Sequence, residues 1–264
     1  MQPIAIFGIT GRMGQALLNA LRGSSDFQLC GAVASAGSAR LGQDAAAEGT
    51  ATGVMITSDP CLAIRGASVA VDFSDSSCAA AHARACAAAG VPILIGATGL
   101  SAADRSSLAD AAREIPVLIA PNTSVGVSVV AKLVSLAALE LGPTYDVEIF
   151  EAHHRMKRDA PSGTALALGE AIAEARSQAL EAIAAYDRKT QDGPRAPGSI
   201  GFASVRAGDI VGEHTVIFAG AGERVEITHR ATDRSTFALG ALRAAEWLIG
   251  RQAGLYGMRH VVGL

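Results

Sequence analysis

The chain has 264 residues, of which 50% are hydrophobic and 18% are charged, and its formal net charge at pH 7 is −3. This composition supplies enough apolar side chains for one large or two modest folded domains and argues against a disordered chain. The negative net charge and the aromatic content of only 4% argue against binding to nucleic acids or to anionic membranes.

The cysteines and the N-terminus indicate a reducing compartment. The four cysteines are Cys30, Cys61, Cys78 and Cys86. They form no C-x-x-C pair and have no histidine at zinc-finger spacing, so we expect buried thiols. The first residues, MQPIAIFG, lack the features of a secretory signal. The apolar stretch 79–99 is interrupted by charged and helix-breaking residues and does not read as a membrane span. We therefore expect a cytoplasmic protein.

The first half of the chain alternates short apolar runs with helical patterns. The runs predicted as strands are Ile4–Phe7, Phe27–Ala34, Ser68–Phe73, Val91–Ile95 and Pro116–Ala120. Helices are predicted over Gln15–Leu21, in an alanine-rich segment that ends near Ala89, and after the capping-box pattern of Ser101 and Asp104. Strands that alternate with helices predict a parallel sheet with right-handed crossovers.

The pattern changes at Val125. Long helices are predicted over Val125–Leu141 and Gly163–Ala175. The segments predicted as strands are Tyr145–Ala152, Ile200–Val205, Thr215–Phe218 and Arg224–His229, with a loop over 191–198. These strands predict a second, mostly antiparallel unit. The final helix, Phe237–Ile249, is expected to pack back on the first domain.

A glycine-rich loop follows the first predicted strand. Gly8, Gly11 and Gly14 form a G-x-x-G-x-x-G pattern directly before the first predicted helix. Glycines allow a tight turn and a close approach to a pyrophosphate, and the helix N-terminus offers N–H groups to it. The spacing departs from the usual G-x-G-x-x-G, so an ordinary strand-to-helix turn stays an alternative. Arg12 could add charge to the site or face solvent.

The second predicted strand ends without the acidic residue that grips the ribose of NAD. Its end reads Ala34-Ser35, which does not repel a 2′-phosphate and favours NADPH without excluding NADH. Ser35 and Arg40 could contact that phosphate. The loops 96–99 and 120–123 also follow predicted strands, where open α/β sheets bind ligands, although either could be a simple turn.

The stretch EAHHRMKRDAPSGTAL, residues 151–166, concentrates polar groups in a largely apolar chain. His153 and His154 are adjacent, so on an extended chain only one of them faces a given reacting centre. Lys157 follows four residues after His153, and a turn could bring the two together. A histidine and a lysine beside a bound anion can hold and deliver a proton.

The same stretch ends in a predicted anion site. Ser162 is a predicted N-cap of the next helix. The backbone N–H groups of Gly163 and Thr164 would then face a docked carboxylate. The stretch therefore suits a small substrate that carries carboxylates.

Other interpretations of the polar residues stay open at this point. The histidine pair could ligate a metal with Glu151, but no convincing ligand set is completed. The charged residues of 155–159 could form a solvated loop. His214 and His229 lie in predicted strands and are interpreted as structural, and His82 and His260 carry no signal.

Seven segments, which span nearly the whole chain in order, resemble the 4-hydroxy-tetrahydrodipicolinate (dihydrodipicolinate) reductase family. They are GITGRMG, VDFS, IGATG, APNTSVGV, EAHHRMKRDAPSGTAL, SVRAGDIVGEHTVIF and EITHRATDRSTFALGALRAAEWL. The segment EAHHRMKRDAPSGTA is highly specific, whereas the glycine loop alone would not be. The absence of an acid at Ala34-Ser35 departs from members that carry Glu or Asp there, which leaves the cofactor preference open.

The resemblance implies an α/β protein with a Rossmann-type parallel sheet domain and a second α/β substrate and oligomerisation domain with an open mixed sheet. We place the first domain at 1–124 and 234–264 and the second at 125–233. The implied reaction is the NAD(P)H-dependent reduction of 4-hydroxy-2,3,4,5-tetrahydrodipicolinate, a cyclic dicarboxylate, in lysine biosynthesis through the diaminopimelate pathway. The cofactor is NADPH or NADH, no metal is expected, and the family is usually a homotetramer.

The resemblance also implies roles for single residues. His153 matches the family's proton donor or acceptor and Lys157 its partner proton donor. His154 matches a substrate contact, and Gly163 and Thr164 match the carboxylate-binding pair. The positions that match cofactor contacts are Gly8, Ile9, Thr10, Gly11, Arg12, Met13, Gly96, Ala97, Thr98, Ala120, Pro121, Asn122 and Thr123.

Two other functions are weighed against the reductase. One is a two-domain nicotinamide oxidoreductase that acts on a sugar or an amino-acid semialdehyde, which would not need the Ser-Gly-Thr anion site. The other is a dinucleotide-sensing regulator, which would tolerate the loss of His153 or Lys157. A substrate panel separates the first, and cofactor binding without turnover would favour the second.

Overall fold

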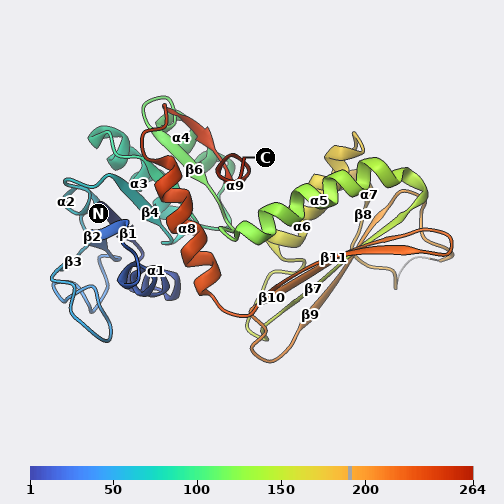
Figure 1. Cartoon of the computed structure of the whole chain (residues 1–264), viewed down its shortest axis with the longest axis horizontal. Helices are drawn as coiled ribbons and strands as arrows, with labels where there is room; N and C mark the ends of the chain where they lie inside the picture. The colour runs from blue at the N-terminus through green and yellow to red at the C-terminus, as the bar shows by residue number, and fades with distance from the viewer. Residues whose placement is uncertain (190–191, 264) are drawn as a thin grey trace. The chain divides into compact units, whose positions relative to one another are not determined.

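The computed structural model describes residues 1–189 and 192–263 (Figure 1). The chain divides into two compact units: unit 1 is Met1–Ser124 with Arg234–Leu264, and unit 2 is Val125–Asp233. The predicted loop over 191–198 begins at Gln191, which lies outside the described residues.

Unit 1 contains, in its described residues, a seven-stranded sheet of order β12-β6-β5-β4-β1-β2-β3 in which each pairing is parallel. The strands are β1 (Gln2–Phe7), β2 (Phe27–Val33), β3 (Ile56–Thr57), β4 (Val69–Asp72), β5 (Ile93–Ile95), β6 (Pro116–Ile119) and β12 (Gly254–Tyr256). The helices are α1 (Arg12–Arg22), α2 (Pro60–Ala63), α3 (Ser76–Ala89), α4 (Ala102–Ala111), α8 (Ser235–Leu248) and α9 (Met258–Val261). The predicted parallel sheet is confirmed, although β3, β12 and the short helices were not predicted.

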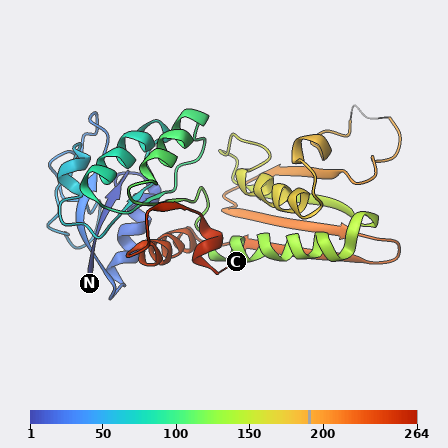
Figure 2. The same cartoon turned by 90° about the horizontal axis from the view of Figure 1, so that it is seen from above.

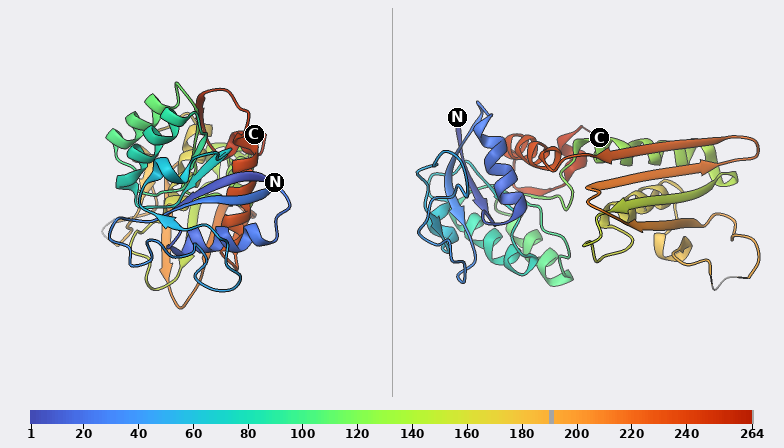
Figure 3. Two further views of the ribbon diagram at one scale, coloured as in Figure 1. Left: turned by 90° about the vertical axis from the view of Figure 1, so that its left-hand side faces the viewer. Right: turned by 90° about the horizontal axis from the view of Figure 1, so that it is seen from below.

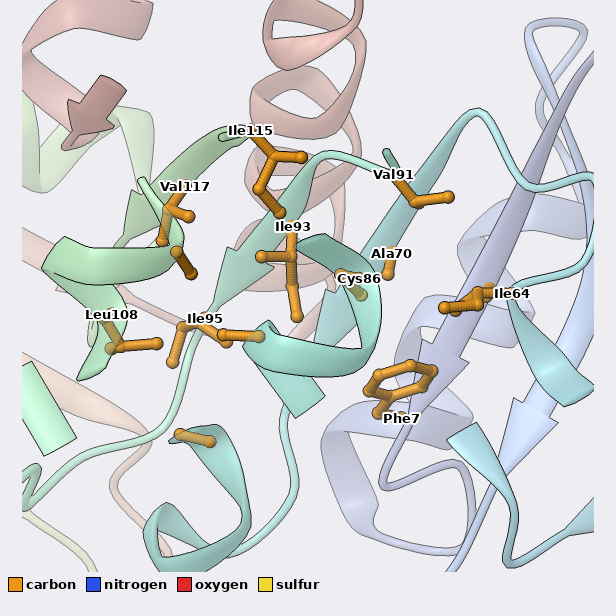
Figure 4. Packing of buried hydrophobic residues seen from close by; sticks show 14 of the residues in the cluster. Phe7, Ile64, Ala70, Cys86, Val91, Ile93, Ile95, Leu108, Ile115 and Val117 are labelled. Atoms are coloured by element: carbon orange, nitrogen blue, oxygen red, sulfur yellow. The ribbon is translucent and has the colours of Figure 1, made fainter. Parts of the chain in front are cut away.

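The apolar runs form strands because a parallel sheet covered by helices buries both of its faces. Every residue of β4 and β5 is buried. Figure 4 shows the side chains of Ile93, Ile95 and Leu108 close together in one layer of this core, which also contains Cys86 of α3. Burial raises the pKa of the Cys86 thiol. Cys61 is exposed, so the expectation of buried thiols is wrong for that residue.

Local signals set the ends of the helices. The predicted capping box is present at α4, where the Ser101 hydroxyl accepts from the Asp104 backbone N–H and Asp104 accepts from Ser101 in return. Gly90 ends α3 with φ +68°, a conformation that favours glycine. The last long helix, α8, packs on α1, β4, β5 and β6 of unit 1 as expected. Gly240 permits this, because a Cβ there would lie 1.9 Å from the Thr123 carbonyl oxygen.

Unit 2 contains, where the structure describes it, a five-stranded sheet of order β11-β10-β7-β9-β8. The strands are β7 (Asp146–His153), β8 (Ala184–Ala185), β9 (Ile200–Arg206), β10 (Gly212–Ala219) and β11 (Arg224–Ala231). The helices are α5 (Val125–Leu141), the 3₁₀ turn η1 (Gly142–Thr144), α6 (Gly163–Ala175) and α7 (Leu180–Ile183).

The prediction of a mostly antiparallel second unit is correct for the strands β7, β10 and β11 but not for β8 and β9. β10 pairs antiparallel with β7 and β11, but β9 pairs parallel with β7 and β8. The reason is the connection from β7 to β9, which contains α6, because a crossover through a helix returns the chain in the same direction. The sheet is therefore mixed and open, as the family resemblance implied.

Two helices cover one face of this sheet. α5 and α6 lie side by side and contact its strands (Figures 1 and 2). In the right-hand view of Figure 3 the strands lie in front of these helices, with the opposite face toward the viewer. Glu151 and His153 of β7 are both buried.

The helical segment Val125–Thr144 is long and apolar enough to cross a membrane, judged by length and composition alone, with a mean hydropathy of 1.8. It is the one such segment in the described ranges. The stretch 79–99, which drew attention in the sequence, is instead divided between α3 and β5. α5 leaves a row of large apolar side chains exposed: Val129, Leu133, Leu136 and Leu139.

Candidate active site

The predicted cofactor loops of unit 1 lie at one edge of its sheet, because parallel strands all end at the same edge. Backbone hydrogen bonds join them. The Gly8 N–H donates to Val33 at 2.9 Å, the Gly96 N–H to Asp72 at 2.7 Å, and the Ala120 N–H to Ile95 at 2.9 Å. The structure therefore brings the loops after β1, β5 and β6 together with the end of β2.

The glycine loop fits a dinucleotide pyrophosphate. Gly8 has φ +77°, and a Cβ at Gly14 would lie 2.3 Å from the Gly8 carbonyl oxygen, so the turn tolerates no side chain there. Gly11 is the N-cap of α1, and no side chain caps that helix end. The first turn of α1 also lacks acidic residues. Its N-terminal N–H groups and positive dipole end thus suit a phosphate group.

The predicted cofactor residues differ in what they can offer. Ile9 is fully buried, so its backbone is the part that can meet a ligand. The Thr123 hydroxyl donates to the Phe237 carbonyl of α8 at 2.6 Å, so this hydroxyl stabilises the fold. The residues with exposed surfaces are Thr10, Gly11, Arg12, Ser35, Thr98 and Pro121. Those that are buried or half-buried are Gly8, Met13, Gly96, Ala97, Ala120 and Asn122.

Arg40 is held by the protein's own backbone. Its Nη2 donates to the carbonyls of Asp44 at 2.7 Å and Ala46 at 2.8 Å. This contact stabilises the loop after β2. Arg40 therefore has a structural role that competes with its predicted role as a 2′-phosphate ligand.

A buried pair behind this edge was missed by the sequence analysis. His82 Nδ1 of α3 lies 2.7 Å from Asp72 Oδ2 at the end of β4. Phe73, which follows Asp72 in the chain, fills the space between the loops that contain Gly8 and Gly96. A Cβ at Gly8 would lie 2.8 Å from the Phe73 backbone, and one at Gly96 would lie 2.2 Å from its ring.

In unit 2 the histidine stretch begins inside β7. The strand extends one residue beyond its predicted end and includes His153. His153 Nδ1 lies 2.6 Å from Glu151 Oε2. Arg206, which pairs with His153 in the parallel register of β7 and β9, grips the same carboxylate through Nη1 and Nη2, each at 2.7 Å.

The predicted turn after His153 is present. The Lys157 N–H donates to the His154 carbonyl at 3.1 Å, and Lys157 Nζ donates to Asp159 Oδ2 at 2.9 Å. The Lys157 side chain is 22% exposed. Burial lowers the pKa of His153, and the charge of Lys157 acts in the same direction. His154 is half-buried.

Ser162 is the N-cap of α6, as predicted, and its hydroxyl accepts from the Ala165 N–H at 3.1 Å. The same hydroxyl lies 2.9 Å from His214 Nε2. Gly163 is exposed and Thr164 is half-buried. The first turn of α6 contains no acidic residue, so this helix end remains suited to an anion.

Burial and neighbouring charges set the protonation of the cluster. Burial lowers the pKa of His153 from its ordinary value of 6.5, while Glu151 raises it. Burial opposes the ionisation of Glu151, but hydrogen bonds from Arg206 and other donors lower its pKa to about 2. Burial also lowers the pKa of His214 to about 3, with the charge of His153 acting in the same direction. At neutral pH the cluster thus has an ionised Glu151, a cationic Arg206 and a neutral His214.

Sequence reasoning did not identify Arg206, weighed Glu151 only as a metal ligand and interpreted His214 as structural. Glu151 and His153 share a face because they are two residues apart on a strand. The predicted strand ended at Ala152, so His153 was not recognised as part of it. Arg206 and His214 arrive from β9 and β10, and their pairing with β7 has no local signal. Within the ranges 1–189 and 192–263, no group of three or more His, Cys, Asp or Glu is placed to hold a metal ion.

Comparison with known protein families covers both units. Residues 2–123 match the family described as dihydrodipicolinate reductase, N-terminus, and residues 126–262 match dihydrodipicolinate reductase, C-terminus. The chain is 53% identical to the 4-hydroxy-tetrahydrodipicolinate reductase of Thiobacillus denitrificans, covering 99% of this chain and 98% of that one. It is 47% identical to the enzyme of the same name from Nitrosomonas europaea, with the same coverage of both chains.

Solved structures give the same result. The dipicolinate-bound dihydrodipicolinate reductase from Paenisporosarcina sp. TG-14 matches with a TM-score of 0.78 and 25% identity, over 98% of this chain and 99% of that one. A myo-inositol dehydrogenase from Corynebacterium glutamicum matches with a TM-score of 0.58 and 15% identity, over 92% and 86% of the two chains. The second likeness extends to the fold alone.

Proposed function

The chain belongs to the dihydrodipicolinate reductase family, and from this premise we propose that His153 and Lys157 form its proton-donating centre. The reaction is the NAD(P)H-dependent reduction of 4-hydroxy-2,3,4,5-tetrahydrodipicolinate to 2,3,4,5-tetrahydrodipicolinate, with loss of water, in lysine biosynthesis through the diaminopimelate pathway. The observation that carries the proposal is the buried His153, held by Glu151 and followed by a turn that carries Lys157.

The reaction consumes one hydride and one proton and releases one water molecule. When bound, the reduced nicotinamide supplies the hydride. His153 supplies the proton, and the pairing of its Nδ1 with a buried carboxylate supports this role. Lys157 acts as its partner and places a positive charge beside the negative charge that develops on the substrate.

The substrate is a dicarboxylate, and three features of unit 2 support its binding there. Lys157 supplies a cation. The N-terminus of α6 presents the backbone N–H groups of Gly163 and Thr164 to one carboxylate. His154 supplies a further polar contact from the same turn. The related Paenisporosarcina enzyme is solved with dipicolinate, a small dicarboxylate.

Unit 1 binds the dinucleotide in this proposal. Residues 8–13 hold the pyrophosphate, and residues 96–98 and 120–123 contact the rest of the cofactor. Ser35 lies at the exposed end of β2 and leaves room for a 2′-phosphate. Reductases of this family use NADPH or NADH, and the absence of an acid beside Ser35 favours NADPH here.

We also propose a homotetramer in the cytoplasm, with unit 2 as the oligomerisation unit. The apolar side chains that α5 exposes, Leu136 at 50% and Leu139 at 62%, support association through this unit. Light scattering that gives four times the 26.8 kDa chain mass is the expected result, and a monomer at micromolar concentration would contradict it. Cell fractionation tests the compartment.

The loss of reduced-nicotinamide absorbance tests the function. The substrate is made in place from pyruvate and aspartate semialdehyde by the preceding synthase, and NADPH and NADH are run in parallel with a blank that lacks this protein. Rapid oxidation is expected, faster with NADPH. The ratio of the two rates reports the effect of Ser35. Tight cofactor binding without oxidation would contradict the reductase.

Lys157→Met tests the assigned centre against a matched control, Arg158→Met, which removes a positive charge from the same turn. Lys157→Met is expected to lower kcat about 100-fold or more, while NADPH binding followed by fluorescence is retained. Arg158→Met is expected to stay within a few-fold of the wild type. Equal losses of kcat in the two variants would show that Lys157 contributes only to the overall positive charge of the loop.

A further inference from the structure

One ring nitrogen of His153 is held and the other is left for chemistry. Glu151 and His153 share one face of β7, and their side chains are 1% and 11% exposed. His153 Nδ1 lies 2.6 Å from Glu151 Oε2. Because an ionised carboxylate can only accept, the proton in this contact belongs to Nδ1. The proton that reacts must then be carried by Nε2.

The Glu151 carboxylate is itself fixed from several sides. Arg206 donates to both of its oxygens in a bidentate pair. The Ser162 backbone N–H donates to Oε1 at 3.1 Å. Arg206 is anchored in turn on the Asp159 carbonyl. A carboxylate with this many donors has little freedom to rotate, so it imposes one orientation on the imidazole.

A glycine keeps space beside the other nitrogen. A Cβ at Gly212 would lie 3.1 Å from His153 Nε2 and 3.4 Å from its Cδ2. Gly212 opens β10 and does not have a positive φ, so the backbone conformation does not demand glycine there. The ring of His214 lies edge-on to that of His153, with 5.1 Å between centroids, and limits its movement on another side.

We propose that Glu151 is a positioning residue for the reductase reaction: it holds the Nδ1 proton of His153 so that Nε2 faces the substrate, where Gly212 leaves room. This inference rests on the proposed function, in which His153 supplies the proton. In the step, the Nε2–H bond of the imidazolium breaks, the substrate gains that proton together with a hydride from the reduced nicotinamide, and water leaves the substrate. His153 is left as a neutral ring that keeps its Nδ1 proton, which stays hydrogen-bonded to Glu151.

The charges around His153 give the proposal a pH signature. The titratable and charged groups that act on it from the neighbouring elements are Glu151, Lys157, Arg206 and His214, and Asp159 pairs with Lys157. Burial, Lys157 and Arg206 lower the pKa of His153, and Glu151 raises it. Removing the charge of Glu151 must therefore lower that pKa further.

The test is the pH profile of kcat/KM for Glu151→Gln, with Asp72→Asn as the matched control in the other buried pair. A proton donor must be protonated, so kcat/KM falls as pH rises through the pKa of His153. Glu151→Gln is expected to move this falling limb to lower pH and to reduce kcat about 100-fold, with NADPH affinity retained. Asp72→Asn is expected to leave the limb in place. A purely structural Glu151 would lower the melting temperature without moving the limb, and that result overturns the proposal.

A second variant tests the proposal even if Glu151→Gln does not fold. Gly212→Ala leaves every ionic contact in place and crowds Nε2, so kcat is expected to fall about tenfold or more at an unchanged melting temperature. Full activity of Gly212→Ala overturns the proposal. His153→Gln separates the failure of the proposed function from the failure of the positioning role. If His153→Gln keeps full turnover, the proposed function fails. If it loses turnover while Glu151→Gln leaves the falling limb of the pH profile in place, only the positioning role is refuted.

Discussion

The two units each contain a buried histidine whose Nδ1 meets a carboxylate, but the surroundings differ. In unit 1 the His82–Asp72 distance is 2.7 Å, and the His82 ring lies edge-on to Phe7, with 4.7 Å between centroids. In unit 2 the His153–Glu151 distance is 2.6 Å, and Gly212 leaves room beside Nε2. The pair geometry alone therefore does not mark a catalytic histidine. In the proposed account, the arginine that supports Glu151 and the space beside His153 Nε2 distinguish the two histidines.

The ionic support of the two carboxylates also differs. Glu151 is gripped by the Arg206 guanidinium. Asp72 accepts a hydrogen bond at 2.8 Å from the Ser74 backbone N–H, in the loop at the cofactor edge. We therefore propose that the first pair orients the imidazole of His153 and that the second holds a loop in place.

The largest expected effect separates the two histidines. His153→Gln is expected to lower kcat by about 100- to 10,000-fold, because it removes the proton donor. His82→Gln, the same change in unit 1, is expected to keep kcat within about tenfold and to act mainly on NADPH affinity through the Phe73 loop. Steady-state kinetics and cofactor titration measure both. Comparable kcat losses in the two variants would erase the contrast.

Arg206→Met tests the ionic support of Glu151. It leaves a buried carboxylate without its cation, so the free energy of unfolding is expected to fall by about 3 kcal/mol at pH 7. The pKa of Glu151, about 2 in the intact protein, lies below its ordinary value of 4.5. The stabilisation is therefore complete above pH 4.5 and is lost as pH falls toward 2. Urea denaturation at pH 7 and pH 4 measures the change.

Arg224→Met is the matched control, because Arg224 pairs with Glu226 in the same unit but is 71% exposed. Its cost is expected to stay below about 1 kcal/mol. Equal costs for the two arginines would show that Glu151 does not depend on Arg206.

His214 gives unit 2 a further dependence on pH. Burial lowers its pKa from 6.5 to about 3, so the unfolded chain binds a proton at higher pH than the folded protein does. Its contribution is complete above pH 6.5 and is lost as pH falls toward 3. His214→Gln removes this titrating group. The free energy of unfolding of the variant is therefore expected to fall less steeply than that of the wild type as pH falls from 6.5 to 4. Parallel curves in calorimetry would contradict the assignment.

The smallest effect compares two helix caps. Ser101 is an exposed cap in unit 1, and Ser162 is a buried cap in unit 2 that also contacts His214. Ser101→Ala is expected to cost about 1 kcal/mol and Ser162→Ala about 2 kcal/mol. Thermal unfolding of the two variants measures the difference. The reverse order would show that the Ser162–His214 contact adds nothing.

Local sequence signals predicted most of the fold. Buried strands such as Ile4–Phe7 and caps such as Ser101 and Ser162 are encoded by residues that are neighbours in the chain. The direction of β9 was not predicted, because it depends on a crossover whose strands are separated by about fifty residues of intervening chain. The two-residue strand β3 was missed because so short a run has no periodicity to detect.

The same limit applies to the site. The stretch 151–166 contains His153, Lys157 and the turn between them, so these candidate residues could be identified from neighbouring positions in the sequence. Arg206 and Gly212 act on that stretch from other strands, through pairing that is set by the assembled sheet. Asp72 and His82 were missed for the same reason, since a strand end and a helix meet only after folding.

The most direct test of the central claim is the protonation state of the His153 ring in the wild-type protein. Nitrogen NMR of ¹⁵N-histidine-labelled protein distinguishes a protonated from an unprotonated ring nitrogen, and His153→Gln identifies the signals. Above the pKa of His153, we predict a proton on Nδ1 and none on Nε2, because Glu151 holds Nδ1. A neutral ring with its proton on Nε2 would contradict the account.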